Sequence, residues 1–163
     1  MQKIGLLSDT HGFIDDKIIN FFKDCDQIWH AGDIGNLETV DKLKKIKPLT
    51  AVFGNIDGYE IRNEYPEKKR FFCENVDVLI THIGGYPGKY TYEVKQEFLK
   101  KPPTLFICGH SHILKIIYDK KYDCLHINPG AAGNSGFHKI KTAIRFVIDK
   151  SDIKELEILE IER

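Results

Sequence analysis

The sequence has no excess of positive or negative residues. It also has no long apolar segment. Lys and Arg together number 24, and so do Asp and Glu, which gives a formal net charge of zero at pH 7. This balance argues against a dedicated nucleic-acid-binding protein. No apolar run approaches the about 18 residues of a membrane-spanning helix, and no apolar signal region follows Met1. We therefore expect no membrane partner and no secretion.

The sequence also lacks a C-x-x-C motif. The four cysteines are Cys25, Cys73, Cys108 and Cys124, and no two of them have C-x-x-C spacing. Cys108 and Cys124 lie inside apolar runs, where a reduced, buried thiol is the usual state. These features predict a cytoplasmic protein.

The composition and length are those of one globular domain, which we expect over residues 1–163, with 42% hydrophobic and 29% charged residues. Apolar patterns predict strands at residues 3–8, 27–32, 49–54, 69–75, 76–82, 104–109, 114–119, 124–128, 142–149 and 155–162. Helices are expected after Asp15 or Asp16, after Asn36, and over residues 91–101, where Pro102 and Pro103 stop the helix. Strand–helix alternation followed by strands predicts a mixed sheet or two packed sheets with helices outside.

Polar clusters follow strand after strand. They read "SDTH", "HAGD", "GNID", "THIGG", "GHSH" and "NPG". In open α/β sheets, functional sites form beyond the carboxyl ends of the strands. We therefore expect these clusters to converge in space.

The cluster in "FICGHSHIL" sets His110 and His112 two residues apart. In an extended segment such residues point to the same side, so both rings could reach one target. Gly109 is expected to give the backbone room to turn there. An isolated pair of this kind is more often two polar loop residues, so its significance depends on the other clusters.

Together the clusters supply oxygen and imidazole donors without a thiolate: Asp9, His11, Asp33, Asn55, His82, His110 and His112. Imidazole suits Zn, Cu, Fe and Ni, whereas carboxylate and carbonyl oxygens favour harder ions. Seven donors are too many for one tetrahedral centre but suit two adjacent metals that share a carboxylate. Such a pair, about 3.5–4 Å apart, supports in-line displacement at phosphorus.

The order D-x-H, G-D, G-N-x-D, H, G-H-x-H resembles the calcineurin-like metallophosphoesterase superfamily, and within it the short phosphodiesterases of the YfcE type. The later "NPG" (residues 128–130) is also typical of that branch. The resemblance spans essentially the whole chain. It implies an α/β fold, a four-layer α/β/β/α sandwich of two mixed sheets.

The resemblance also implies two divalent metal ions, with Mn expected and Ni, Fe or Zn as alternatives. The first metal would bind Asp9, His11 and His112, the second Asn55, His82 and His110, and Asp33 would bridge them. Asp33, Asn55 and His82 would be catalytic, and a small phosphodiester would be hydrolysed by attack of a metal-bridging hydroxide. Asp57 either orients a ligand through a hydrogen bond to imidazole or stabilises a turn.

One position departs from the pattern, and several alternatives stay open. Many family members carry histidine after the Asn of "GN", but this chain has Ile56, which cannot protonate a leaving group.

The alternatives are a metal-binding scaffold, such as the retromer subunit of this fold, a phosphomonoesterase and a nuclease. The expected partner is a small phosphoester, with self-association as a further expectation. The loop of residues 84–93 is expected at the mouth of the site, with Tyr86 or Lys89 near substrate.

Overall fold

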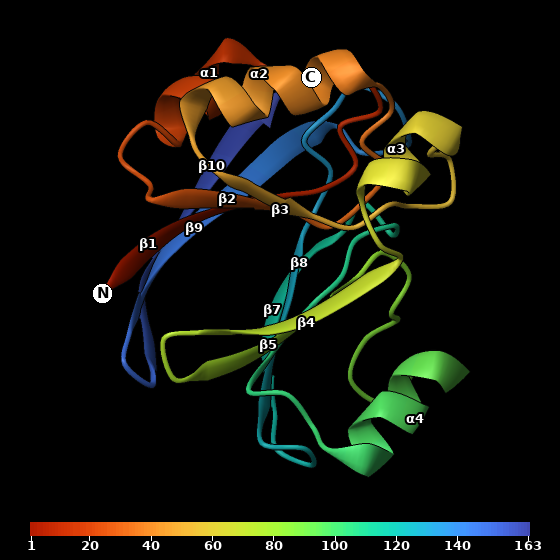
Figure 1. Cartoon of the computed structure of the whole chain (residues 1–163), viewed down its shortest axis with the longest axis vertical. Coiled ribbons are helices and arrows are strands. Elements are labelled where there is room, and N and C mark those ends of the chain that lie inside the picture. Colours follow the sequence, from red (N-terminus) through yellow and green to blue (C-terminus); the bar gives the residue numbers. More distant parts are fainter.

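Two five-stranded mixed sheets pack face to face in the computed structural model, which describes residues 1–163 (Figure 1). Helices α1 (Asp16–Phe21) and α2 (Leu37–Ile46) cover the first sheet, and α3 (Tyr59–Glu64) lies beyond its edge. Helix α4 (Tyr92–Lys100) lies on the outer side of the second sheet. The expected four-layer α/β/β/α sandwich is confirmed.

The first sheet has the order β10-β9-β1-β2-β3, and the second β4-β5-β6-β8-β7. The strands are β1 (Gln2–Leu7), β2 (Gln27–His30), β3 (Leu49–Ala51), β4 (Lys68–Cys73), β5 (Val76–Thr81), β6 (Leu105–Ile107), β7 (Leu114–Asp119), β8 (Cys124–Pro129), β9 (Ile140–Asp149) and β10 (Asp152–Glu162). β1, β2 and β3 run parallel, as do β5, β6 and β8, whereas the outer pairs are antiparallel. Each sheet therefore has a block of parallel strands whose carboxyl ends lie at one edge.

Strand β1 shows why the inner strands are apolar on both faces. Ile4 and Leu6 point into the core between the sheets, whereas Leu7 packs toward the helices and a Cβ at Gly5 would touch the ring of Phe22. Both faces of such a strand are buried, so the run is continuously apolar instead of alternating. Burial of one such side chain stabilises the fold by about 1.5–3 kcal/mol.

Side-chain caps begin the helices that the sequence predicted. The carboxylate of Asp15 accepts a bond from the amide of Lys17 at α1, and Asn36 caps α2. Helix α3 was not expected, because it has six residues, only Ile61 is buried, and its N-cap Gly58 offers no side-chain bond. None of the four helices has the length and apolar character needed to cross a bilayer.

Three parallel strands end earlier than predicted. β2 ends at His30, β3 at Ala51 and β6 at Ile107, where strands to residues 32, 54 and 109 were expected. The chain leaves the sheet at these points and forms the loops that hold the polar clusters.

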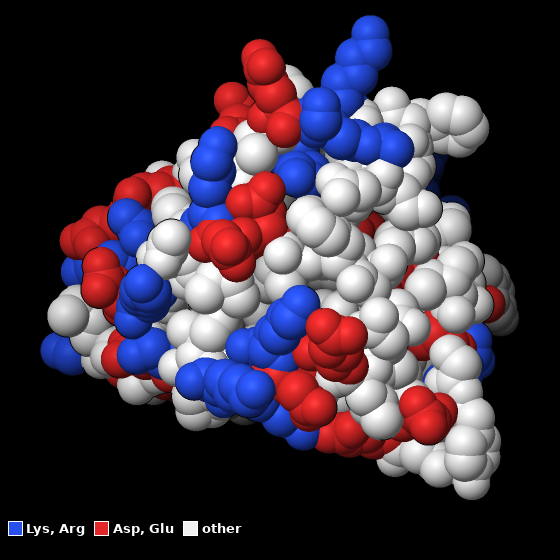
Figure 2. Space-filling view, turned by 90° about the horizontal axis from the view of Figure 1, so that it is seen from above, with Lys and Arg blue, Asp and Glu red and all other residues white.

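The surface view shows acidic and basic side chains interspersed and not segregated by sign (Figure 2).

Candidate metal centre

The predicted ligands come together where the two blocks of parallel strands end. Asp9 and His11 follow β1, Asp33 follows β2, Asn55 follows β3, His82 follows β5, and His110 and His112 follow β6. Four donors therefore come from the first sheet and three from the second. Two groups of donor atoms result.

The first group is Asp9, His11 and His112, whose donor atoms lie within 4.8 Å of one another. Oδ1 of Asp9 is 3.1 Å from Nε2 of His112 and 3.8 Å from Nε2 of His11. Its other oxygen accepts bonds from Ser8 Oγ at 2.6 Å and from the amide of His110 at 3.1 Å. These two bonds hold the carboxylate so that Oδ1 faces the imidazoles.

The second group is Asp33, His82 and His110, again within 4.8 Å. Nε2 of His82 lies 3.2 Å from Oδ2 of Asp33. The amide oxygen of Asn55 lies 3.0 Å from Nδ1 of His110, which brings the seventh residue to this group.

Asp33 stands between the two groups. Its Oδ2 atom is 3.4 Å from Nε2 of His11 in the first group and 3.2 Å from Nε2 of His82 in the second. Its Oδ1 atom accepts a bond from the amide of Ile56 at 3.0 Å. One carboxylate oxygen therefore faces both groups, which is the arrangement of a ligand shared by two cations.

Unpartnered polar atoms at the centre fit bound cations. Oδ1 of Asp9 and the Nε2 atoms of His11 and His82 are buried without a hydrogen-bond partner, a costly state unless a ligand satisfies them. Nδ1 of His82 donates to the carbonyl of Ala31 at 2.8 Å, so the lone pair on Nε2 points into the site. Oxygen and imidazole donors without thiolate suit divalent transition metals.

The two carboxylates are held ionised. Burial raises the pKa of Asp9, but the imidazoles of His11 and His112 beside Oδ1 and the bond from Ser8 outweigh it and keep that pKa far below its ordinary value. Burial likewise raises the pKa of Asp33, but the neighbouring imidazole of His82 and the bond from the amide of Ile56 lower it by more than burial raises it. Cation binding requires this deprotonated state.

The backbone at the ligands is strained. Positive φ angles occur at Asp9 (54°), His11 (47°), Asp33 (55°), His110 (70°) and His112 (60°). Side-chain-bearing residues rarely adopt this region, and each instance costs on the order of 1–3 kcal/mol. Strain of this kind concentrates at functional sites because the surrounding fold enforces it.

The rule that residues two apart in an extended segment point to the same side does not apply to His110 and His112. β6 ends at Ile107, and His110 and His112 both have left-handed backbone conformations in the following loop. Gly109 is needed for a different reason from the one expected. A Cβ at this position would lie 2.1 Å from Ser8 Oγ and 2.7 Å from Oδ2 of Asp9, so only glycine lets the loop approach β1.

Asp57 makes no hydrogen bond to an imidazole, which corrects one of its two expected roles. Its carboxylate accepts bonds from the amides of Ile34 at 3.1 Å, Gly35 at 2.8 Å and Gly54 at 2.8 Å. These contacts tie the loop after β3 to the loop after β2. The turn-stabilising alternative describes this residue.

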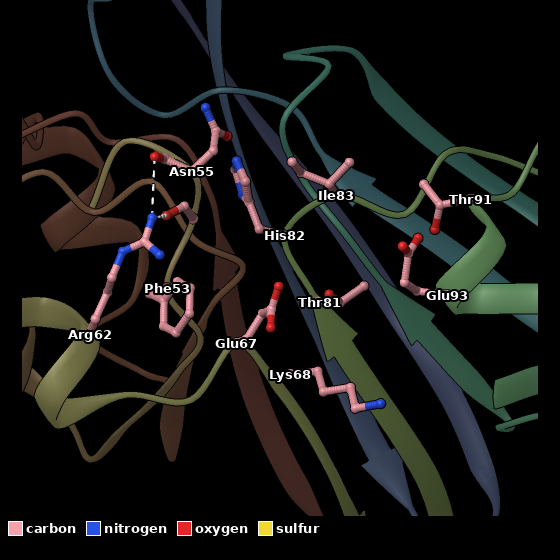
Figure 3. Close-up of a pocket in the computed structure, with 11 residues that line it drawn as sticks. Phe53, Asn55, Arg62, Glu67, Lys68, Thr81, His82, Ile83, Thr91 and Glu93 are labelled. Atoms are coloured by element: carbon pink, nitrogen blue, oxygen red, sulfur yellow. Dashed lines mark hydrogen bonds between the residues drawn. The ribbon is translucent and has the colours of Figure 1, made fainter. Parts of the chain in front are cut away.

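Arg62 of α3 is a contributor that the sequence interpretation missed. Its Nε donates to the carbonyl of Asp57 at 2.6 Å. Its Nη2 donates to the carbonyls of Gly54 at 3.4 Å and Asn55 at 3.3 Å (Figure 3). The guanidinium carbon lies 4.5 Å from the ring centroid of Phe53. Arg62 thus fixes the loop that carries Asn55, and it was missed together with its helix.

A cavity of about 410 Å³ opens beside Asn55 and His82 (Figure 3). It is lined on its other sides by Thr81, Ile83, Thr91 and two carboxylates, those of Glu67 and Glu93. A space of this size accommodates a small substrate next to the centre.

Comparison with known proteins agrees with this geometry. The family model described as the calcineurin-like phosphoesterase superfamily domain matches residues 2–151. A probable metallophosphoesterase of Methanothermobacter thermautotrophicus is 30% identical over 134 residues, which cover 78% of this chain and 76% of that protein.

Solved structures share the fold at lower identity. An archaeal phosphodiesterase has a TM-score of 0.74 at 23% identity, over 96% of this chain and 99% of that one. Vps29 from Chaetomium thermophilum has a TM-score of 0.77 at 15% identity over the whole of both chains. Vps29 from Entamoeba histolytica, solved in complex with Zn²⁺, has a TM-score of 0.74 at 16% identity, over 98% of this chain and 98% of that chain. With the family match and the archaeal relative, these findings confirm the predicted resemblance: the chain belongs to the calcineurin-like phosphoesterase superfamily.

Proposed function

We propose that the protein is a phosphodiesterase that uses two divalent metal ions to hydrolyse a small phosphodiester. The observation that carries the proposal is the position of Asp33, whose Oδ2 atom faces an imidazole of each donor group at 3.4 and 3.2 Å. A shared carboxylate between two sets of donors is what a pair of adjacent metals requires.

Each of the two donor groups would bind one of the two ions. Asp9, His11 and His112 would hold one ion, Asn55, His82 and His110 the other, and Asp33 both. When bound, the ions, Mn²⁺ in this proposal, would supply Lewis acidity that polarises the phosphoryl group and lowers the pKa of water. The ionised carboxylates of Asp9 and Asp33 supply negative charge to hold the cations, and Ala31 keeps the ring of His82 oriented.

The leaving oxygen lacks an obvious proton donor beside Asn55. Ile56 occupies the next position, is 46% exposed, and has only apolar side-chain atoms. We therefore propose that turnover is efficient with an activated leaving group and slow with an alkyl one, because general acid catalysis contributes about 10²- to 10⁴-fold.

The alternative function is a metal-binding scaffold, since Vps29 structures share the fold. The discriminating experiment uses metal-stripped protein with Mn²⁺, Ni²⁺ or Zn²⁺ restored. The substrates are bis(4-nitrophenyl) phosphate and 4-nitrophenyl phosphate. Metal-dependent diester hydrolysis that is lost in Asp33→Ala supports the proposal. Tight metal binding without hydrolysis of either ester supports the scaffold, and preferred monoester hydrolysis would make the protein a phosphomonoesterase.

A further inference from the structure

A second cavity lies on the other side of Ile83 and Thr91, which line both cavities. Its volume is about 420 Å³. Its lining includes Tyr86, His110, Ser111, Lys115, His126 and Asn128. Because His110 is one of the predicted metal ligands, this cavity adjoins the centre from the β7–β8 side of the second sheet.

Lys115 brings an uncompensated positive charge to this cavity. The residue is half-buried on β7, and its ammonium group lies 4.3 Å from the ring centroid of Tyr86. Six lysines of the chain pair with carboxylates, and Lys115 is among the others, with no acidic partner within 4.0 Å. The aromatic ring holds the ammonium group in place without neutralising it.

His126 adds unused hydrogen-bonding capacity to the same cavity. The residue is 1% exposed, and both of its ring nitrogens lack a partner. Its ring packs near those of Tyr90 and Phe106, with centroids 5.9 and 5.6 Å away. Buried polar atoms are rarely left unpaired, so this residue indicates a cavity that receives a polar group.

The two cavities differ in charge. The first cavity is lined by two acidic residues, Glu67 and Glu93, and by two basic residues, Arg62 and Lys68, so that its charged side chains balance (Figure 3). No Asp or Glu lines the second cavity. A second negatively charged group is therefore attracted more strongly to the Lys115 side than to the first cavity.

We propose that the Lys115 cavity binds a second anionic group of the substrate, a phosphate or carboxylate carried by one of the ester groups of the phosphodiester. This inference rests on the proposed phosphodiesterase function. Lys115 pairs with the anion, and His126 offers it a further hydrogen bond. The substrate class is thus a phosphodiester with an additional negative charge beyond the scissile phosphate.

The test compares three 4-nitrophenyl phosphodiesters whose second ester group is propyl, 2-carboxyethyl or 2-phosphonooxyethyl. With the Mn²⁺-loaded protein, we expect kcat/KM for an anionic diester to exceed that for the propyl diester by about tenfold. The preference should fall toward unity in Lys115→Met and persist in Lys115→Arg. Lys95→Met, an exposed lysine of α4, is the matched control and should keep the wild-type ratio. The more favoured anion identifies carboxylate or phosphate as the ligand.

An equal rate for charged and neutral diesters, or a preference that survives Lys115→Met, would overturn the subsite while leaving the phosphodiesterase function intact. Absence of turnover of all three diesters would instead count against the function. A second readout then decides the subsite. Inorganic phosphate and acetate are titrated into metal-free protein while the ring resonances of Tyr86 are followed by NMR. Shifts that disappear in Lys115→Met support the subsite, and shifts that persist, or none at all, contradict it.

Discussion

Oδ2 of Asp33 lies 3.2 Å from Nε2 of His82, and the two residues follow strands of different sheets. Both side chains are buried. The candidate centre is therefore a junction between the sheets, and the ligands keep their positions only while the sheets stay packed.

Removing the charge of Asp33 should remove the cation pair. In Asp33→Asn we expect the bound metal, measured by mass spectrometry after dialysis, to fall from two ions toward one or none. We expect diester turnover to fall more than about 100-fold, since removing even an outer-shell partner of a metal ligand costs about 10- to 100-fold. Asp41→Asn, at an exposed site on α2, is the matched control. Two ions retained with full activity would exclude the bridging role.

A methyl group at position 109 should displace the side chains of Ser8 and Asp9 and so disturb the metal centre. Its Cβ would lie 2.1 Å from Ser8 Oγ and 2.7 Å from Oδ2 of Asp9, so the hydroxyl and carboxylate must shift. We expect Gly109→Ala to lose about 1–3 kcal/mol of unfolding free energy and to bind metal more weakly. Gly58→Ala is the control, because a Cβ there meets nothing within 4 Å. Urea unfolding and metal titration measure both effects, and equal behaviour of the two variants would contradict the prediction.

Arg62 should act as a positioning residue through the loop that carries Asn55. We expect Arg62→Met, which keeps an unbranched side chain but loses the three carbonyl bonds, to weaken metal affinity by about 10- to 100-fold. Calorimetric titration with Mn²⁺ provides the affinity, and the thermal midpoint of the metal-free protein reports on folding. Glu60→Gln on the same helix is the control. A purely structural role would lower the thermal midpoint of Arg62→Met without changing its metal affinity.

A histidine introduced at Ile56 should supply the missing proton donor. We expect Ile56→His to raise turnover of an alkyl phosphodiester by about tenfold or more, with little change for bis(4-nitrophenyl) phosphate, whose leaving group needs no proton. Steady-state kinetics of both esters provide the comparison. Ile56→Gln separates proton donation from polarity. If turnover of the alkyl ester is unchanged in Ile56→His, proton donation is not what limits the reaction.

His126 should make the fold sensitive to acid. Burial lowers the pKa of His126 to about 4 from an ordinary value of 6.5. Between these values the unfolded chain binds a proton that the folded chain does not, so stability falls as the pH drops from about 6.5 to 4 and is fully present above that range. The 2.5-unit difference corresponds to a loss of up to about 3 kcal/mol.

Replacing His126 by phenylalanine tests this linkage. At pH 7.5, His126→Phe should equal or exceed the native stability, because the two nitrogens of His126 lack partners. At pH 5 its advantage should widen. Urea unfolding of the metal-free proteins at both pH values measures the difference. His30, whose pKa burial also lowers to about 4, is present in both proteins and cancels from the comparison. A constant difference between the two pH values would refute the linkage.

Most of the fold and the grouping of the candidate ligands followed from patterns local in the sequence. The apolar runs are long enough to mark the strands, and each ligand follows a strand within a short polar cluster. The position of these clusters at the strand ends predicted their convergence. Helix α3 escaped notice because its N-cap Gly58 offers no side-chain signal, whereas the equally short α1 is preceded by the capping residue Asp15. Arg62 was missed for the same reason.

Other features depend on contacts between distant segments. The need for glycine at position 109 arises from Ser8, about a hundred residues away in the sequence. The left-handed conformations of His110 and His112 are imposed by the loops around them, since residues other than glycine adopt that region in only a few per cent of cases. The charge of Lys115 became informative only once Tyr86 and His126 were found around the same cavity.

The position of β1 in its sheet has a consequence for the order of assembly during synthesis. This strand precedes Asp9 and His11, and it lies between β2 and β9, with Gln2 opposite Ile148. A nascent chain that has emerged only as far as His112 already contains all seven candidate ligands, yet β1 still lacks one of its two neighbours. Such long-range pairing slows folding. The centre should therefore be completed only after β9 has left the ribosome and paired with β1.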